Sequence, residues 1–292
     1  MTREALLVTH TGRPGNTAHA RTVAADLLDA GFTVRVMADE VADVDLAGVE
    51  PASGPGAADG VEIVFALGGD GTFLRAADLA RPAKAPLLGI NLGKVGFLAE
   101  AETADLDRAV GDVVAEAYTV DERLTVDVLI EPVGRPAIRS WALNELTVEK
   151  SDRERMIEVL VDVDGRPLSR YGCDGVVCAT PTGSTAYAYS AGGPVVWPEV
   201  EALLLVPISA HALFSRALVT APTSTIRVTV DPYTSSAVVC CDGRRVFDVG
   251  PGAVVTVRRG ELPVRVVRLR PSPFTDRLVE KFALPVDGWR TR

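Results

Sequence analysis

The sequence is poor in the residues that build metal clusters and disulfide frameworks. It holds 4 cysteines and 3 histidines among 292 residues. No two cysteines form a C-x-x-C pair, and the histidines lie away from them in the sequence. Zinc sites and disulfide scaffolds usually have more cysteines, at regular spacings. We therefore expect no zinc site and free, mostly buried thiols, as in a reducing cytoplasm.

Long apolar runs and an excess of basic residues are also missing. No run approaches the ~20 apolar residues of a membrane span, and the chain enters a strand-like stretch at residue 5 without a charged and then apolar leader. The formal net charge is −9, which disfavours broad contact with nucleic acid or anionic lipid, although a local basic pocket stays compatible with it. We expect a cytoplasmic protein without membrane or nucleic-acid partners, long enough for two domains.

The first part of the chain alternates between strand-like and helix-like spacing. Short apolar runs at 5–9, 32–37, 61–67 and 86–91 alternate with helical patterns at 17–30, 73–79 and 103–117. This alternation predicts a doubly wound, Rossmann-like α/β domain, whose ligands bind at the carboxyl ends of the parallel strands. Residues 41–60 are acidic and then rich in Gly, Ala and Pro, and we interpret them as a surface loop.

The hydrophobic period falls to two beyond residue 118. Alternating runs at 124–130, 157–163 and 226–230, with further strands at 254–258 and 264–269, predict a β-sandwich. Asp242-Gly243 is typical of a hairpin turn. Helical spacing returns at 274–284, so a last helix is expected to pack back on the first domain. The expected domains are 1–120, with 271–292 returning to it, and a β-rich domain at 121–270.

The stretch Gly68-Gly69-Asp70-Gly71-Thr72 stands between a predicted strand and a predicted helix. Glycines at such a turn let the backbone approach a ligand closely, and a helix start attracts phosphate. Asp70 is the unusual member because a carboxylate repels phosphate, which suggests a role toward a hydroxyl or a metal. The spacing fits neither a Rossmann fingerprint nor a P-loop. Phosphoryl transfer and a purely structural turn are the two interpretations.

A second unusual stretch lies inside the β-rich half. Residues 173–194 are dense in glycine and small hydroxyl residues, with TPTGSTAY at 180–187. Hydroxyls and backbone N–H groups at a helix start can bind phosphate or ribose, and Tyr187 could stack on a base. The alternative is an ordinary Ser/Thr loop that caps a helix.

Taken together, these motifs resemble the bacterial NAD kinases, and the wording GCDGV and AHALF resembles their actinobacterial members. The matching pieces cover most of the chain from about residue 60: GGDGT, 89–93 and 96–98, Asn144-Glu145, 174–187, 190–194, 207–213, Asp242-Gly243 and the terminal segment. Lipid kinases and phosphofructokinases share only GGDGT. Ala210 and Ala217 depart from the family pattern, which often has proline there.

The resemblance implies transfer of the γ-phosphoryl group of ATP, with polyphosphate as an alternative donor, to the 2′-hydroxyl of the adenosine ribose of NAD. Asp70 is the implied catalytic residue, which orients the hydroxyl and takes its proton late. Mg²⁺ is implied to arrive with ATP and not in a cage of protein ligands. A homodimer or homotetramer is also implied. The implied phosphate turn is Gly68, Gly69 and Thr72. The implied NAD-binding residues are Asp70, Gly71, Arg75, Asn144, Glu145, Arg155, Asp174, Thr185, Ala186, Tyr187, Ala188, Tyr189 and Ser190.

Several of these residues keep a second interpretation. Arg75 either reaches a phosphate or is a surface arginine. Asn144 and Glu145 suit adenine and ribose, but they could equally be a polar strand end. Arg155 lies in what looks like a solvated hairpin, and His211 is interpreted as structural. At the level of function, the alternatives are a lipid kinase of the GGDGT group, which leaves Asn144-Glu145 and TPTGSTAY unexplained, and a non-catalytic dinucleotide sensor, which leaves Asp70 unexplained.

Overall fold

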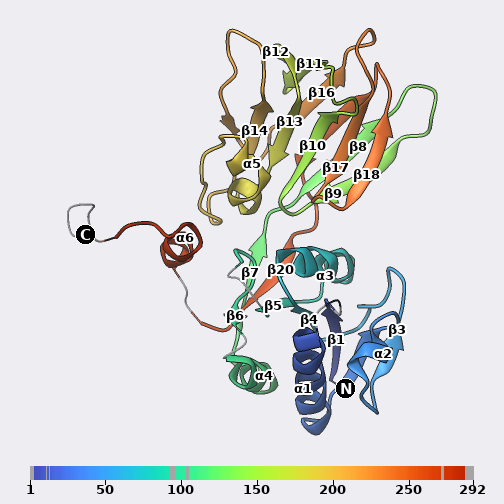
Figure 1. The fold of residues 1–292 in the computed structure, drawn as a ribbon, viewed down its shortest axis with the longest axis vertical. Coiled ribbons are helices and arrows are strands. Elements are labelled where there is room, and N and C mark those ends of the chain that lie inside the picture. The colour runs from blue at the N-terminus through green and yellow to red at the C-terminus, as the bar shows by residue number, and fades with distance from the viewer. Residues whose placement is uncertain are drawn as a thin grey trace. The chain divides into compact units, whose positions relative to one another are not determined.

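The computed structural model describes residues 3–10, 12, 14–92, 96–102, 105–270 and 273–286. Gly93 of the second glycine motif and the last residues of the terminal segment lie outside these ranges. The chain forms two compact units: the α/β unit comprises Met1–Glu122 and Val264–Arg292, and the β unit comprises Arg123–Pro263 (Figure 1). No helix among the described residues is both long and apolar enough to cross a membrane.

The α/β unit is built on one sheet of eight strands in the order β3-β2-β1-β4-β5-β20-β7, with β6 beside β5. The strands are β1 (Glu4–Thr9), β2 (Thr33–Met37), β3 (Glu50–Ala52), β4 (Ile63–Leu67), β5 (Leu87–Asn91), β6 (Ala101–Glu102), β7 (Thr119–Arg123) and β20 (Val264–Arg268). The helices are α1 (Pro14–Asp29), α2 (Val41–Val44), α3 (Asp70–Ala83), α4 (Leu106–Val114) and α6 (Phe274–Phe282).

Helices cover both faces of this sheet, which confirms the predicted doubly wound α/β fold. β1 pairs in parallel with β2 on one side and β4 on the other, so the chain changes direction across the sheet at this point. The side chains of Ile63, Phe65 and Leu67 pack in one apolar cluster with α1 and α4, while α3 packs against β4 and β5. Ligands of such sheets bind at the carboxyl ends of the strands beside the switch, where β4 leads into α3.

The prediction of a surface loop over residues 41–60 is wrong in part. Helix α2 begins at Val41, and β3 pairs in parallel with the edge of β2, from Arg35↔Glu50 to Met37↔Ala52. The strand β3 is three residues long and contains Pro51. Proline is tolerated at a sheet edge because one side of an edge strand needs no donor. Pairing with β2, and not a local apolar pattern, makes this segment a strand.

The terminal helix α6 belongs to the α/β unit, as predicted. Its phenylalanines Phe274 and Phe282 pack against the ring of Phe97, with centroid distances of 6.2 Å and 5.6 Å. Phe97 belongs to the family-like stretch 96–98, and the structure gives its ring this packing role.

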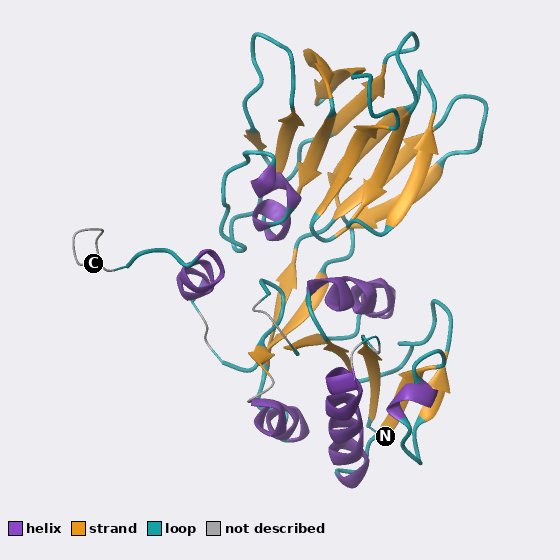
Figure 2. Cartoon of the chain, viewed as in Figure 1, coloured by secondary structure: helices purple, strands orange, loops and turns teal. Residues whose placement is uncertain are grey.

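The β unit consists of two six-stranded sheets with antiparallel pairing throughout (Figure 2). One sheet has the order β15-β14-β13-β10-β17-β18 and the other β12-β11-β16-β19-β8-β9. The strands are β8 (Val126–Glu131), β9 (Ile138–Ala142), β10 (Glu145–Lys150), β11 (Ile157–Val163), β12 (Arg166–Cys173), β13 (Gly175–Ala179), β14 (Leu203–Ile208), β15 (Leu218–Thr220), β16 (Ile226–Val230), β17 (Ala237–Cys241), β18 (Arg245–Val249) and β19 (Val254–Arg259). Between β13 and β14 lie a 3₁₀ turn (Thr182–Thr185) and helix α5 (Tyr187–Ser190).

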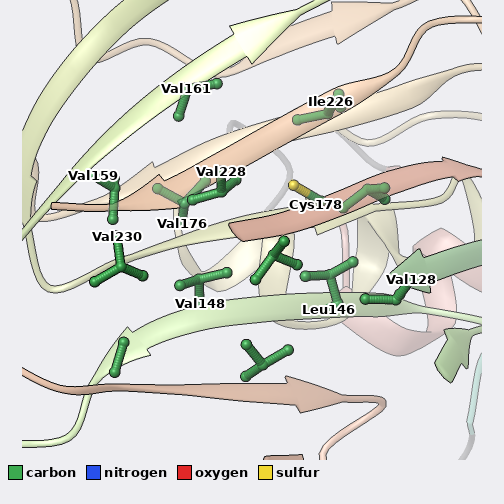
Figure 3. Packing of buried hydrophobic residues seen from close by; sticks show 14 of the residues in the cluster. Val128, Leu146, Val148, Val159, Val161, Val176, Cys178, Ile226, Val228 and Val230 are labelled. Atoms are coloured by element: carbon green, nitrogen blue, oxygen red, sulfur yellow. The ribbon is translucent and has the colours of Figure 1, made fainter. Parts of the chain in front are cut away.

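The predicted β-sandwich is confirmed by the apolar core between the two sheets. Leu146 and Val148 of β10 face Val159 and Val228 of the other sheet within one buried cluster (Figure 3). The Asp242-Gly243 turn has positive φ at both residues, 53° and 64°, as the two central residues of a type I′ turn require, and the Arg244 N–H donates to the Cys241 carbonyl across it at 3.0 Å. The four cysteines are free thiols, as expected, and three of them are buried.

Candidate functional site

The GGDGT turn joins the carboxyl end of β4 to the start of α3. Gly69 caps the helix from an extended conformation, and Asp70 is the first helical residue. An ideal Cβ on Gly68 would lie 2.4 Å from Thr72 Oγ1, so Gly68 leaves room for the buried Thr72 side chain. By contrast, a Cβ on Gly69 or Gly71 would meet no atom of another described residue within 4 Å, chain neighbours and the helix's own backbone aside. These two glycines are therefore not required by packing, which leaves open space at the helix start, where anions bind well.

Arg75 does not lie free on the helix surface. Its guanidinium donates to the Thr9 carbonyl oxygen at 2.6 Å and pairs with the carboxylate of Glu40. Glu40 is only 2% exposed and also accepts the Thr9 N–H at 2.8 Å. Burial raises the pKa of Glu40, while the Thr9 N–H and Arg75 oppose that rise. A phosphate contact of Arg75 stays a prediction, and its described contacts tie α3 to the end of β1.

Asn144 and Glu145 are held in place by Asp242 of the β17–β18 hairpin. The Asp242 carboxylate accepts the backbone N–H groups of Leu143 (2.9 Å), Asn144 (2.8 Å) and Glu145 (3.4 Å). Arg245 pairs with the same carboxylate at 2.9 Å. Sequence reasoning recognised Asp242 as a turn residue and as part of a family-like pair, without a contact to Asn144-Glu145. A buried carboxylate almost 100 residues away from its partners has no local signal, so this positioning role becomes visible only in the fold.

Buried polar atoms without partners mark the start of β10. Among the described residues, Asn144 Oδ1, Glu145 Oε2 and Thr147 Oγ1 are buried and have no hydrogen-bond partner. Leu146 and Val148 face the sandwich core, so Glu145 and Thr147 point to the opposite face of the sheet. Buried polar groups are almost always paired in proteins. Three orphaned oxygens at one end of a strand therefore indicate a place where a polar ligand binds.

The carboxyl of Glu145 is held largely neutral. Burial is the main cause and the charge of Asp242 the second, and together they raise the pKa of Glu145 to about 8. A backbone hydrogen bond from Tyr187 acts in the opposite direction. Below this pH the group can donate as well as accept, which suits recognition of a ribose hydroxyl or a base edge.

Residues 180–190 pack beside this cluster. The Thr180 and Ser184 hydroxyls are used internally: Thr180 bonds the Leu143 carbonyl, and Ser184 bonds the Val196 carbonyl at 3.1 Å. Ala188 is fully buried in an apolar cluster. Thr185 and Ala186 are half-buried, whereas Tyr187, Tyr189 and Ser190 are exposed. The structure thus brings Tyr187 beside Asn144-Glu145 and gives Ala188 a packing position.

Asp174 and Arg155 lie toward the other end of β10. Asp174 pairs with Lys150 at 2.6 Å, and this contact is the main reason that the pKa of Asp174 is lowered. Glu145 and Lys150 are the two ends of β10, about 16 Å apart at the usual strand rise. Arg155 is exposed and follows the bend at 151–154. His211 is exposed and bridges to Gly172 through its N–H, at 2.8 Å.

The stability of the protein is expected to depend on Glu145 in a pH-dependent way. Its folded pKa of about 8 lies above the ordinary value of 4.5 for a glutamate, so the folded state keeps a proton that the unfolded chain releases. Stability is therefore lost as the pH rises from 4.5 to 8. Glu145→Gln removes this loss of stability. We therefore expect the unfolding free energy of the variant, minus that of the wild type, to increase by on the order of 4 kcal/mol between pH 5 and pH 9.

Thermal unfolding measured between pH 5 and 9 tests this expectation. Glu131→Gln is a matched control, because Glu131 is exposed at the end of β8. Equal pH profiles for wild type and Glu145→Gln would show that the buried carboxyl does not titrate differently on folding.

No group of three or more His, Cys, Asp or Glu side chains that could hold a metal ion occurs among the described residues. The carboxylate at the GGDGT turn is Asp70, whose Oδ1 accepts the Leu98 N–H at 3.3 Å. A single carboxylate beside a phosphate-binding turn is enough for Mg²⁺ that is carried by substrate phosphates.

Known proteins resemble this chain over nearly its whole length. The family model described as ATP-NAD kinase N-terminal domain matches residues 6–118, and the ATP-NAD kinase C-terminal domain matches residues 143–269. An NAD kinase of Thermobifida fusca is 57% identical over 99% of this chain and 92% of that protein. NAD kinase 2 of Streptomyces avermitilis is 56% identical over 99% of this chain and 97% of that protein.

Solved structures agree with the sequence comparisons. A yeast NADH kinase in complex with NADH has the same fold, with a TM-score of 0.92, 21% identity, and coverage of 100% of this chain and 90% of that one. An NAD kinase from Archaeoglobus fulgidus in complex with ATP has a TM-score of 0.74 and 27% identity, covering 97% of this chain and 99% of that one. With both family domains matched in order and relatives above 50% identity over the full length, the chain belongs to the NAD kinase family.

Proposed function

We propose that the chain transfers the γ-phosphoryl group of ATP to the 2′-hydroxyl of the adenosine ribose of NAD, giving NADP. The observation that carries the NAD site is the set of orphaned buried oxygens on Asn144, Glu145 and Thr147. A dinucleotide offers ribose hydroxyls and an adenine amine that would satisfy such acceptors.

Asp70 is the residue proposed to accept a hydrogen bond, and then the proton, from the 2′-hydroxyl. Phosphoryl transfer passes through a loose transition state, so catalysis depends mainly on positioning and on neutralising charge. The Asp70 carboxylate orients the hydroxyl and takes its proton as the new O–P bond forms, while the bond from the γ-phosphorus to the β-γ bridging oxygen of ATP breaks. The open space at Gly69 and Gly71 lets phosphate and ribose approach the helix start.

Mg²⁺ is proposed to enter with ATP, where it neutralises phosphate charge and keeps several waters. The GGDGT turn belongs to the α/β unit, and the orphaned oxygens of Asn144, Glu145 and Thr147 belong to the β unit. A cytoplasmic homodimer or homotetramer is part of the same proposal. The oligomer is supported by large exposed apolar side chains of the β unit, which include Trp197, Leu213, Phe214 and Val219, since unusual apolar exposure marks association surfaces.

The reaction is tested by incubating the protein with NAD, ATP and Mg²⁺ and detecting NADP with an NADP-specific dehydrogenase. We expect NADP from the wild type and almost none from Asp70→Asn. A second arm replaces ATP with polyphosphate and decides whether that donor is used. NAD binding without NADP formation from either donor would favour a dinucleotide sensor. Absence of both NAD binding and turnover would favour another acceptor, such as a lipid.

Tyr187→Ala is expected to weaken NAD binding about tenfold while kcat at saturating NAD changes little. Tyr187 is 38% exposed beside the orphaned oxygens, and an aromatic ring packed against a base contributes on the order of 1 kcal/mol or more. Calorimetric titration with NAD measures the effect. Tyr233→Ala is the matched control, because Tyr233 is 96% exposed. An unchanged NAD dissociation constant in Tyr187→Ala would remove Tyr187 from the site.

A further inference from the structure

The Asp70 carboxylate lies against residues 96–98, which follow β5 in the chain. Leu98 donates its N–H to Asp70 Oδ1 at 3.3 Å. An ideal Cβ on Gly96 would lie 2.3 Å from Asp70 Oδ1 and 3.0 Å from Asp70 Cγ. The φ angle of Gly96 is not in the left-handed range. Position 96 therefore requires a residue without a side chain, because the Asp70 carboxylate occupies the space of a Cβ.

Helix α6 holds this segment in place through Arg277. The Arg277 guanidinium donates to the Phe97 carbonyl at 3.2 Å and to the Ala99 carbonyl at 2.9 Å. It also donates to Glu100 Oε2 at 2.6 Å. Three contacts from one planar group fix the backbone on both sides of Leu98. In the same segment, the Phe97 ring packs against Phe274 and Phe282 of α6.

Glu100 makes the Arg277 contact rigid. The Glu100 side chain is only 2% exposed, and its carboxylate pairs with Arg268 of β20 as well as with Arg277. Arg268 also pairs with Asp121 at 2.9 Å. A buried carboxylate shared by two guanidinium groups is costly to rearrange, because any movement would leave a buried charge without its partner.

We propose that α6, through Arg277, is a positioning element for the catalytic carboxylate. It fixes residues 96–100 so that the Leu98 N–H and the space at Gly96 hold Asp70 in one orientation toward the acceptor hydroxyl. A misplacement of about 1 Å at a reacting group can cost a hundredfold in rate. The inference rests on the proposed role of Asp70, and it gives the C-terminal helix a function that no motif in its sequence suggests.

Arg277→Gln tests the proposal. We expect kcat to fall between about tenfold and a hundredfold, with the NAD dissociation constant within twofold of the wild-type value. Arg277→Lys keeps the charge beside Glu100 but cannot make all three contacts, so it should recover part of the loss. Arg265→Gln is the matched control: Arg265 also donates to a backbone carbonyl, that of Lys84 at 2.8 Å, but on an exposed part of the α/β unit.

Gly96→Ala provides a second variant that leaves α6 untouched. Its new methyl group displaces the Asp70 carboxylate directly, so we expect a loss of kcat at least as large, again with NAD binding retained. If Arg277→Gln does not fold, as judged by its unfolding midpoint, this variant decides. Full activity in Gly96→Ala would overturn the proposal, as would an Arg277→Gln protein that folds and retains wild-type kcat.

The double variant separates positioning from a merely structural role. If Arg277 acts through Asp70, Arg277→Gln should lower kcat strongly in the wild-type background but only slightly in the Asp70→Asn background. An equal fold-loss in both backgrounds would overturn the proposal. Asp70→Asn measured alone keeps the two proposals distinguishable. Wild-type turnover in Asp70→Asn would contradict the function of Asp70 itself, whereas an inactive Asp70→Asn beside a fully active Arg277→Gln would contradict only the role of α6.

Discussion

Asp70→Asn is expected to lower kcat by about three orders of magnitude, because general-base catalysis by a positioned side chain contributes 10²- to 10⁴-fold. Asparagine has nearly the same shape, and its Oδ1 can still accept the Leu98 N–H that holds Asp70 at 3.3 Å. It can orient a hydroxyl weakly, but it cannot take the proton. The loss should therefore appear in kcat, with the NAD dissociation constant changed by less than about threefold.

Initial rates from NADP formation and calorimetric titration with NAD together measure this split. Asp107→Asn is a suitable control, because Asp107 is an exposed acid in the first turn of α4. If Asp70→Asn kept near-normal turnover, the acceptor carboxylate would have to be sought elsewhere. If it lost NAD binding together with turnover, Asp70 would be a binding residue and not a catalytic one.

Much of the fold follows from periodicity, because periodicity reports which faces of an element are buried. The apolar run before GGDGT is β4, and all of its residues are buried in the middle of the sheet. Alternation in β11 and β16 separates the sandwich core from solvent. Both patterns are local, so the sequence alone was sufficient to predict them.

The membership of a strand in a sheet is not local. β20 has the same alternating valines as the sandwich strands, yet it pairs in parallel with β5 of the α/β unit. Its pattern identifies a strand but carries no information about its neighbour. The short strand β3 is the opposite case, since it has almost no apolar pattern and exists because β2 offers it an edge.

The candidate site divides in the same way. GGDGT and Tyr187 were recognisable because their residue types are unusual for the elements that carry them, and Asn144-Glu145 and Asp242-Gly243 through the resemblance to the NAD kinases. Glu40 and Arg277 were not recognisable, because buried ion pairs with distant segments give them their roles. The contacts of Asp242 with the distant Leu143–Glu145 backbone also had no signal in the sequence. An isolated Glu or Arg in a sequence looks like a solvated surface residue until the fold supplies its partner.

Gly183→Ala is expected to have the largest effect on the β unit. An ideal Cβ on Gly183 would lie 2.0 Å from the carbonyl oxygen of Asn144 and 2.7 Å from its Cα. These are backbone atoms, which cannot move aside as a flexible side chain could. The Asn144 backbone is fixed further by Thr180, whose N–H donates to the same carbonyl at 2.9 Å, and by Asp242. The φ angle of Gly183 is not left-handed, so alanine suits the local backbone and the clash alone is tested.

The clash must push the 180–187 segment away from Asn144-Glu145. We expect the free energy of unfolding to fall by about 3 kcal/mol or more, the upper range for overpacking a rigid site. NAD binding should weaken by at least tenfold, because the orphaned oxygens and Tyr187 would no longer share one geometry. Thermal unfolding and NAD titration at a temperature where the variant is folded measure the two effects separately.

Gly250→Ala supplies the comparison that makes the result interpretable. Gly250 also belongs to the β unit and has a φ outside the left-handed range, but a Cβ there would meet no atom within 4 Å in the described part of the chain, its chain neighbours aside. The two variants therefore add the same methyl group and remove the same backbone freedom, and they differ in what the methyl group touches. Equal stability and equal NAD affinity in both would mean that the contact between the TPTGST turn and Asn144 can relax freely. A loss confined to Gly183→Ala would show that this contact sets the geometry of the NAD site.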